Sequence, residues 1–544
     1  MTANKKKPAC PSCKSMNNYV SASTRRKCKD CGKSFPIDGK YRKPAQPPPQ
    51  AETCPQCSSA EPPRRRGSRN GRYKVACKSC GYSWSAGRYA VAKPTKVDGD
   101  VFVISCAVND TSVHGPFLRA LEGYAAKRNA RLIIIPIRYK NPTSQAEGEK
   151  PYTYAKSLLP YLVDDRLQPC AGLQILADIK TQPTAVNPLA NMDGLTGTDS
   201  CIVGHPRLAL EPVATRGHEL PKLMLTTGAV TRANYSRTVA GSRGEFNHVH
   251  GAVVVEVSRK SGKFHLRHIN ATGSGSFIDL DTEYLPDGTT QAAGRPLALV
   301  LGDVHAELHD PAAIAATRQQ IAMLNPRRVV LHDVHNHGSA SHHLNVWERF
   351  ARRVTGTDKV GEELQKTAAM IDSFYRPGQE TVIISSNHHD HLGKWLADHR
   401  NGDDMQNAGL YHRAKAAVLG AIEKAGTIPD IFALIMRPML KSPARFVGNG
   451  DSYQVGGVEL GMHGHEGPNG SRGSAKSLNK IGVKSIVGHG HAPHTVGGCM
   501  QVGTLSLLKM GYNTGPSSWM HGNVIEYANG KRSHLHIIDG EWRT

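Results

Sequence analysis

Long apolar runs are missing from this 544-residue chain, and no stretch approaches the roughly 18 uncharged apolar residues of a membrane-spanning helix. The stretch Met1–Lys7, which ends in three lysines, leads to Pro8 and Cys10 without the apolar core of a secretory signal peptide. The sequence therefore predicts a protein that contacts no membrane and works in the cytoplasm in which it is made. Its length is sufficient for several domains, each with a core of its own.

Acidic residues are scarce in the first part of the chain. The whole chain has a formal net charge of +23, and residues 1–100 contain 22 Lys and Arg but only 6 Asp and Glu. This segment alone carries +16, which leaves +7 for the other 444 residues. Such an imbalance is typical of a basic module that contacts a polyanion, although a basic tail that only aids solubility has the same composition.

Cysteine is unevenly distributed as well, because eight of the twelve cysteines lie within the first 80 residues. They form four C-x-x-C pairs, and two such pairs on facing hairpins supply four thiolates to one tetrahedral zinc ion. A reducing cytoplasm favours zinc over disulfide bonds, which are the alternative interpretation. The sequence predicts two structural zinc sites, one in residues 1–40 from Cys10, Cys13, Cys28 and Cys31 and one in residues 53–86 from Cys54, Cys57, Cys77 and Cys80.

Basic and aromatic residues surround these cysteine pairs, among them Arg64–Arg66, Tyr73 and Trp84. Both modules resemble the zinc ribbons of transposases and transcription proteins, in which such side chains can contact phosphates and stack on bases. DNA is therefore the expected partner of the two ribbons, and docking to a protein is the alternative. Residues 41–52, which include Pro47–Pro49, are expected to be an extended linker between the ribbons.

Residues 97–294 form a middle region in which the sequence shows no catalytic motif. Apolar residues at 101–104 and 132–135 flank a helical pattern at 117–125, which predicts a β-α-β unit. Over residues 295–544, apolar runs alternate with helical segments such as 311–324 and 408–425. This alternation predicts an α/β domain built in layers.

Seventeen of the 27 histidines lie within residues 301–500, many of them in five short clusters of His, Asp and Asn. Several clusters directly follow apolar runs that are typical of strands. Side chains at strand ends can meet at one edge of a sheet, and these residue types are ligands of first-row divalent metals. The clusters are Asp303-Val304-His305, His332-Asp333-Val334-His335-Asn336-His337, Asn387-His388, His463-Gly464-His465 and His489-Gly490-His491.

In order and spacing, these clusters resemble the motifs of the calcineurin-like metallophosphoesterases, which are D-x-H, G-D-x-x-D, G-N-H-D/E, a lone His and G-H-x-H. The resemblance covers residues 296–500 and implies two sheets packed between helices, with two divalent metals at the strand ends. It assigns one metal to Asp303, His305 and His491, and the other to Asn387, His463 and His489, with Asp333 bridging both. His465 is the alternative to His463 in the lone-His position.

The same resemblance makes His388 the general acid that protonates the leaving alkoxide. The chain departs from the family pattern in having His332 for Gly, Asn336 for the second Asp of G-D-x-x-D, and His389 for Asp or Glu. Asn336 would therefore have to orient His388 in place of the usual acid, with His335 and His337 as alternatives. The arginine that protein phosphatases carry just after the second motif is also missing, which makes that branch the less favoured one.

The resemblance thus predicts a metal-dependent nuclease that hydrolyses DNA phosphodiesters by a two-metal mechanism, nearest to the recombination-repair branch of the family. Mn²⁺ is the first expectation for the catalytic ions, with Zn²⁺, Fe²⁺ or Mg²⁺ as alternatives. The combination with zinc ribbons also resembles bacteriophage early proteins of host DNA breakdown, which would place the protein in the host cytoplasm. The alternatives are a DNA-binding regulator with an inactive phosphoesterase scaffold and a phosphatase of nucleotides or small phosphoesters. A homo-oligomer, or a protein partner bound through the ribbons, stays open.

Overall fold

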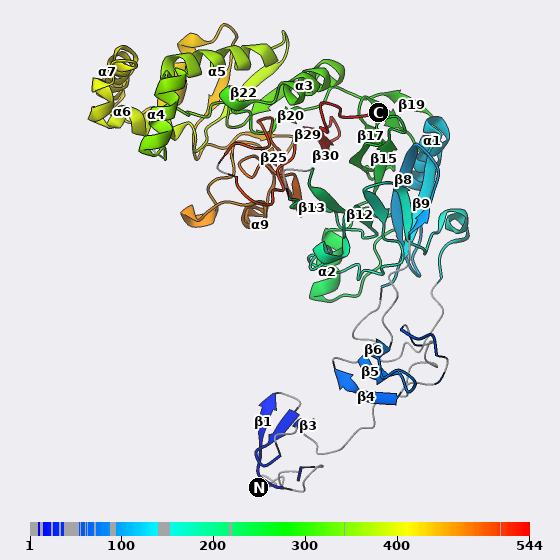
Figure 1. Cartoon of the computed structure of the whole chain (residues 1–544). Coiled ribbons are helices and arrows are strands. Elements are labelled where there is room, and N and C mark those ends of the chain that lie inside the picture. Colours follow the sequence, from blue (N-terminus) through cyan, green and yellow to red (C-terminus); the bar gives the residue numbers. More distant parts are fainter. Residues whose placement is uncertain are drawn as a thin grey trace, which may run out of the picture. The chain divides into compact units, whose positions relative to one another are not determined.

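The computed structural model of the chain divides into two compact units, Met1–Val91 and Ala92–Thr544 (Figure 1). The described residues are 9–10, 15–22, 25–31, 34–36, 54, 56–59, 61, 64–69, 72–86, 94–139, 153–216, 220–341, 343–511 and 513–544. The expected linker at residues 41–52 lies outside them. No helix among the described residues is long and apolar enough to cross a membrane.

The first unit contains two small antiparallel sheets of three strands each. Their strands are β1 (Asn18–Ala22), β2 (Arg25–Cys28) and β3 (Ser34–Pro36), and β4 (Arg64–Arg69), β5 (Arg72–Ala76) and β6 (Ser83–Ala86). In each sheet the middle strand runs into a C-x-x-C pair, since Cys28 ends β2 and Cys77 follows β5. This arrangement puts the thiols at the ends of hairpins, where two pairs can converge.

The second unit contains a four-stranded sheet in the order β16-β15-β8-β9. Its strands are β8 (Val101–Val108), β9 (Arg131–Ile137), β15 (Gly251–Val257) and β16 (Phe264–Asn270). The parallel strands β8 and β9 are joined by α1 (Gly115–Arg128), which buries Phe117, Leu121 and Tyr124 and ends at Asn129 in the left-handed conformation. The predicted β-α-β unit is therefore confirmed.

A six-stranded sheet in the order β23-β22-β21-β20-β29-β30 supports the first three clusters. Its strands are β20 (Ala298–Val300), β21 (Arg328–Leu331), β22 (Glu380–Ile384), β23 (Arg445–Val447), β29 (Gly522–Glu526) and β30 (Arg532–His536). The first four strands are parallel, and the helices between them include α3 (Pro311–Leu324), α5 (Val360–Phe374) and α7 (Ala408–Ala425). The predicted alternation of strands and helices is confirmed here.

An eleven-stranded sheet combines strands from both expected regions of the second unit. Its order is β24 (Gln454–Val455), β25 (Val458–Glu459), β26 (Lys484–Val487), β28 (Cys499–Gln501), β27 (His494–Val496), β13 (Ala209–Val213), β14 (Lys222–Thr226), β12 (Ser200–Val203), β11 (Leu173–Ile175), β10 (Leu167–Cys170) and β7 (Thr95–Lys96). The two regions join where Leu210 pairs with Thr495. The expected boundary between 97–294 and 295–544 therefore does not separate two folded units, because their strands pair in one sheet.

The two larger sheets pack face to face, and alternation along the strands explains how. On β20, Val300 points into a core that also contains Val458 and Ile486 of the eleven-stranded sheet, whereas Leu299 points into the core beneath the helices. This mixed α/β arrangement agrees with the predicted class.

The remaining elements are α2 (Val239–Phe246), α4 (Val346–Thr355), α6 (Asp390–Ala397), α8 (Ile431–Met436), α9 (Ala475–Leu478), β17 (Phe277–Asp279), β18 (Thr282–Tyr284), β19 (Thr290–Ala292) and seven 3₁₀ segments among the described residues.

Glu526 on β29 is a fully buried carboxyl group whose oxygens accept no hydrogen bond from the described residues. Burial raises the pKa of Glu526 to about 7, and Arg532 on the neighbouring strand offsets only part of this effect. Because the pKa is higher in the folded chain than in the unfolded chain, the contribution of Glu526 to stability is full below the unfolded pKa. It is lost as the pH rises through about 7.

Replacing Glu526 by glutamine removes this ionisation. We expect Glu526→Gln to raise the free energy of unfolding at pH 8, by about 3 kcal/mol at most, and to change it little at pH 5. Denaturant unfolding of both proteins at the two pH values measures the difference. An equal change at pH 5 and pH 8 would contradict the proposed cause.

Candidate metal centres

The five clusters meet at one edge of the paired sheets. Asp303, Asp333 and Asn387 follow the ends of β20, β21 and β22, which run parallel and therefore end on the same side. His463 follows β25, and His489 and His491 follow β26, in the facing sheet. Each of the two facing sheets thus supplies some of the predicted ligands.

The backbone around these residues is constrained. His305, Asp333, His489 and His491 all have a left-handed backbone, with φ of 42°, 39°, 70° and 55°. Each such residue costs on the order of 1–3 kcal/mol, and strained residues of this kind cluster at functional sites. A β-carbon at Gly488 would lie 2.4 Å from Oδ1 of Asp303, so the glycine before His489 is required by close approach.

The first group of ligand atoms comprises Asp303, His305, Asp333 and His491, all buried and within 4.8 Å of one another. Nε2 of His491 lies 3.0 Å from Oδ2 of Asp303 and 3.1 Å from Nε2 of His305. The backbone N–H of His489 donates to Oδ2 of Asp303 at 2.8 Å. These four side chains can hold a metal ion.

Asp333 lies between this group and a second set of ligands. Its Oδ2 is 3.8 Å from Nε2 of His305 and 3.1 Å from Nε2 of His463. The rings of His463 and His489 lie 5.3 Å apart. Oδ1 of Asn387 is buried and accepts no hydrogen bond from the described residues, as is also true of Oδ1 of Asp333. Buried oxygens in this state fit the donor set of a divalent cation.

The choice between His463 and His465 rests on where each ring lies. His463 is buried with Nε2 next to Asp333, whereas Nε2 of His465 is 3.8 Å from the exposed carboxylate of Glu466. The geometry therefore favours His463, the predicted choice. His332 was not predicted as a neighbour, yet its Nδ1 lies 3.4 Å from Nδ1 of His463.

The pKa values of several of these side chains are shifted in directions that favour binding of a cation. Burial lowers the pKa of His305 to about 3 and that of His489 to about 4, so both rings are neutral and carry a free lone pair near pH 7. Burial alone would raise the pKa of Asp303, but the nearby His463 and His491 outweigh it and lower that pKa to about 2. His305 and His489 thus offer neutral imidazoles, and Asp303 offers an ionised carboxylate. Asp333 and Asp303, in contrast, outweigh the burial of His463 and raise its pKa.

His388 is half-buried beside this cluster, with its ring 4.8 Å from the ring of His305. Its Nδ1 lies 3.1 Å from the backbone carbonyl oxygen of Asn336. Asn336 is therefore next to His388 as predicted, but the contact uses its backbone and not its side-chain amide. The alternative residue His335 is directed to Glu307 and Thr367 instead.

A cavity of about 510 Å³ opens over the cluster. Asp333, His388 and His489 form part of its lining, and Arg472, Lys476 and Trp519 form other parts. The ring of Trp519 lies 4.1 Å from that of His491 in an edge-to-face arrangement. No local pattern pointed to Arg472, Lys476 or Trp519, because they lie outside the five motifs.

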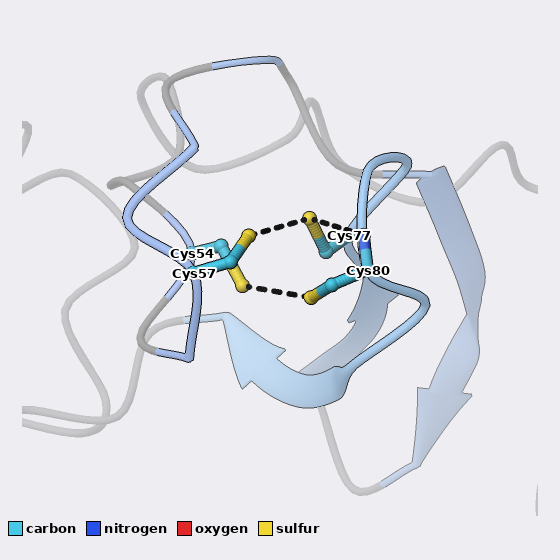
Figure 2. Close-up of side chains that lie close together, drawn as sticks. All are labelled: Cys54, Cys57, Cys77 and Cys80. Carbon is cyan, nitrogen blue, oxygen red and sulfur yellow. Dashed lines mark hydrogen bonds between the residues drawn. The ribbon is translucent and has the colours of Figure 1, made fainter.

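The cysteines of residues 53–86 converge in the first unit (Figure 2). The sulfur atoms of Cys54 and Cys80, and those of Cys57 and Cys77, lie 3.6 Å apart. This distance is far beyond a disulfide bond and close to the edge of about 3.8 Å of a zinc–thiolate tetrahedron. Hydrogen bonding from the backbone N–H of Cys80 lowers the pKa of Cys77 to about 6, which favours the thiolate. This group can hold zinc.

The cysteines of residues 1–40 show the same arrangement where they are described. Cys10, Cys28 and Cys31 form a group that can hold a metal ion, and the sulfur atoms of Cys10 and Cys31 lie 3.6 Å apart. Cys13 lies outside the described residues, as do the side chains of Arg64–Arg66, Tyr73 and Trp84. The predicted contacts of those side chains with DNA stay predictions.

Comparison with known proteins places the chain among phage proteins. No family model matches it. Among solved structures, a chitobiase of Flavobacterium johnsoniae is 10% identical, covers 74% of this chain and 57% of its own, and has a TM-score of 0.17, too low to carry an argument. Protein A1 of Escherichia phage T5 is 33% identical over an alignment of 469 residues, and the match covers 82% of this chain and 83% of that protein. The chain therefore belongs to the family of phage T5 Protein A1.

Proposed function

We propose that this protein is a metal-dependent phosphodiesterase that hydrolyses DNA, with a two-metal centre of the calcineurin-like type. The observation that carries the proposal is the position of Asp333. One buried carboxylate lies 3.1 Å from His463 and 3.8 Å from His305, and so contacts both sets of ligands. A carboxylate in this position would help to hold both ions of a two-metal centre.

The layers of the second unit support the same assignment. Two sheets pack face to face, helices cover the outer face of the six-stranded sheet, and the ligand clusters follow the strand ends. The resemblance implies two sheets packed between helices, and the paired sheets with helices on one outer face support it. The eleven-stranded sheet extends beyond this arrangement through β7 and β10–β14, an addition that the middle region supplies.

Different residues of the chain would hold the metal ions and protonate the leaving group. Bound divalent ions would supply Lewis acidity and a water nucleophile near neutral pH. Asp303, His305 and His491 would hold one ion, and Asn387, His463 and His489 the other. His388, half-buried in the wall of the cavity, would donate a proton to the leaving alkoxide. No covalent bond between enzyme and substrate is needed.

The cavity favours a nucleic acid as substrate. Arg472 and Lys476 are exposed and form no ion pair with a described carboxylate, so both can contact phosphates beside the scissile one. Trp519, on the same cavity, offers an aromatic ring to a base. The basic first unit would add affinity for DNA that does not depend on sequence and that falls as salt increases. Membership of the family of phage T5 Protein A1 is consistent with action in the host cytoplasm.

Plasmid DNA incubated with the full chain tests the proposal directly. We expect degradation with Mn²⁺, weaker or no degradation with Mg²⁺ or Zn²⁺, and none with EDTA. A purified, metal-loaded protein that binds DNA without cleaving it would favour the regulatory alternative. Cleavage of nucleotides or small monoesters, but not of DNA, would favour a phosphatase.

The basic wall of the cavity makes a separate prediction. The double variant Arg472→Gln and Lys476→Gln should raise KM for DNA and reduce the slope of log affinity against log salt by up to about 2, because two phosphate contacts are lost. Turnover of bis(p-nitrophenyl) phosphate, which lacks flanking phosphates, should stay within about twofold. Lys480→Gln is the matched control, since Lys480 is exposed nearby but does not line the cavity. An unchanged salt slope would contradict this placement of the DNA.

A further inference from the structure

His388 lacks a carboxylate partner of its own in the second motif, because Asn336 occupies the position of the expected acid. The structure shows what contacts it instead. Nδ1 of His388 lies 3.1 Å from the backbone carbonyl oxygen of Asn336, to which its N–H can donate a hydrogen bond. The orientation of the His388 ring therefore depends on how firmly the backbone at residue 336 is held.

Glu307 holds that backbone. It lies in the 3₁₀ turn Ala306–Leu308, two residues after His305, and its side chain is 9% exposed. Oε2 of Glu307 accepts a hydrogen bond from the backbone N–H of Asn336 at 2.8 Å. Oε1 lies 2.6 Å from Nδ1 of His335, the preceding residue. One buried carboxylate thus contacts two consecutive residues of the loop that contacts His388.

A second buried acid holds the other end of this loop, at Ser339. Both oxygens of Glu363, on α5, accept the backbone N–H of Ser339 at 3.1 Å, and Oε1 also accepts its hydroxyl group at 2.8 Å. Arg352 lies 3.3 Å from the same carboxylate and offsets its charge. The loop is therefore anchored near both ends, and Glu307 is the anchor nearer to His388. Charge-assisted hydrogen bonds of this kind are stronger than neutral ones.

We propose that Glu307 is the positioning residue for His388, and that it replaces the missing acid of the second motif by acting through the backbone of Asn336. This inference rests on the proposed function, in which His388 is the general acid. Its sequence signature is D-x-H-x-E, Asp303 to Glu307, in which the acid comes from the first motif and not from the second.

Another role is open to the same side chains, because Glu307, His335 and Glu363 lie close enough together to hold a metal ion. The hydrogen bonds from Asn336, Ser339 and Arg352 already use both carboxylates, which favours the positioning role. Metal content distinguishes the two, since a ligand variant would lose an ion per chain and a positioning variant would not.

The experiment is a double-mutant cycle on the full chain with Mn²⁺. Glu307→Ala should lower DNA turnover about 10–100-fold, as for other residues that orient an active-site group. It should cause no further loss in a His388→Ala background, because the ring that it orients is gone. Glu307→Gln, which keeps an oxygen that can accept the Asn336 N–H, should recover part of the activity. Glu362→Gln, an exposed acid on α5 that pairs with Lys359, is the control without effect.

Two substrates separate positioning from general damage. Bis(p-nitrophenyl) phosphate has a good leaving group that needs little protonation, so Glu307→Ala should affect its turnover less than that of DNA. Equal losses on both substrates, a further loss in the His388→Ala background, or the loss of a metal ion would each overturn the inference.

A readout that does not depend on activity keeps the inference distinct from the proposed function. The ¹⁵N signals of the His388 ring, assigned by their absence in His388→Ala, should show a hydrogen-bonded Nδ1–H that is lost in Glu307→Ala. If the wild type hydrolyses neither substrate, the proposed function fails and these signals still decide the positioning role. Identical ring signals in wild type and Glu307→Ala would overturn it.

Discussion

Asp333→Asn should abolish DNA hydrolysis, with a loss of at least about 10³-fold, because metal ions contribute several kcal/mol to catalysis and Asp333 contacts both sets of ligands. Its side chain is 1% exposed, and its Oδ2 lies 3.1 Å from His463. Asparagine has nearly the same shape but no charge, so the fold should persist while the affinity for the ions falls.

Metal analysis of the purified protein by mass spectrometry, together with plasmid cleavage, measures both effects. Asp281→Asn, a change of the same kind at an exposed position away from the cluster, should leave metal content and activity as they are. Full activity and unchanged metal content in Asp333→Asn would end the proposal of a two-metal centre.

His388→Ala should separate chemistry from metal binding. Because His388 is the proposed general acid and not a ligand, its loss should lower DNA turnover by roughly 10²–10⁴-fold while the metal content persists. The loss on bis(p-nitrophenyl) phosphate should be much smaller, since nitrophenolate leaves without protonation. Single-turnover rates on both substrates, with metal content from the same preparation, measure the difference.

His399→Ala is the matched control for this variant, because His399 is an exposed histidine of the same unit and contributes to no metal group among the described residues. A parallel loss of metal in His388→Ala would make His388 a ligand. An equal loss on both substrates would show that it does not act as an acid.

Local patterns predicted the secondary structure well where one face of an element is buried. The segments 311–324 and 408–425 are α3 and α7 of the structure, because their apolar spacing has the helical period. The shared eleven-stranded sheet was not predicted. Its central pairing joins Leu210 to Thr495, residues far apart in the chain, and no local pattern specifies which distant strand edge another strand will meet.

The sequence by itself determined which residue types are available for chemistry and the order in which they occur. The C-x-x-C pairs and the His, Asp and Asn clusters can be recognised without a structure, because thiolates, imidazoles and carboxylates at such spacing are typical of metal ligands. It also determined that Asn336 stands where the family pattern has the second Asp of G-D-x-x-D.

Only the tertiary structure decided which atoms meet. It placed Asp333 between His305 and His463, and it packed Trp519 against His491. It also brought the carboxylate of Glu307 within hydrogen-bond distance of the backbone N–H of Asn336. These contacts join separate strands, turns and loops, and they depend on sheet packing and on left-handed backbone at ligand positions. Such geometry arises from the whole fold, because the strain at each position is offset by packing elsewhere and not by neighbours in sequence.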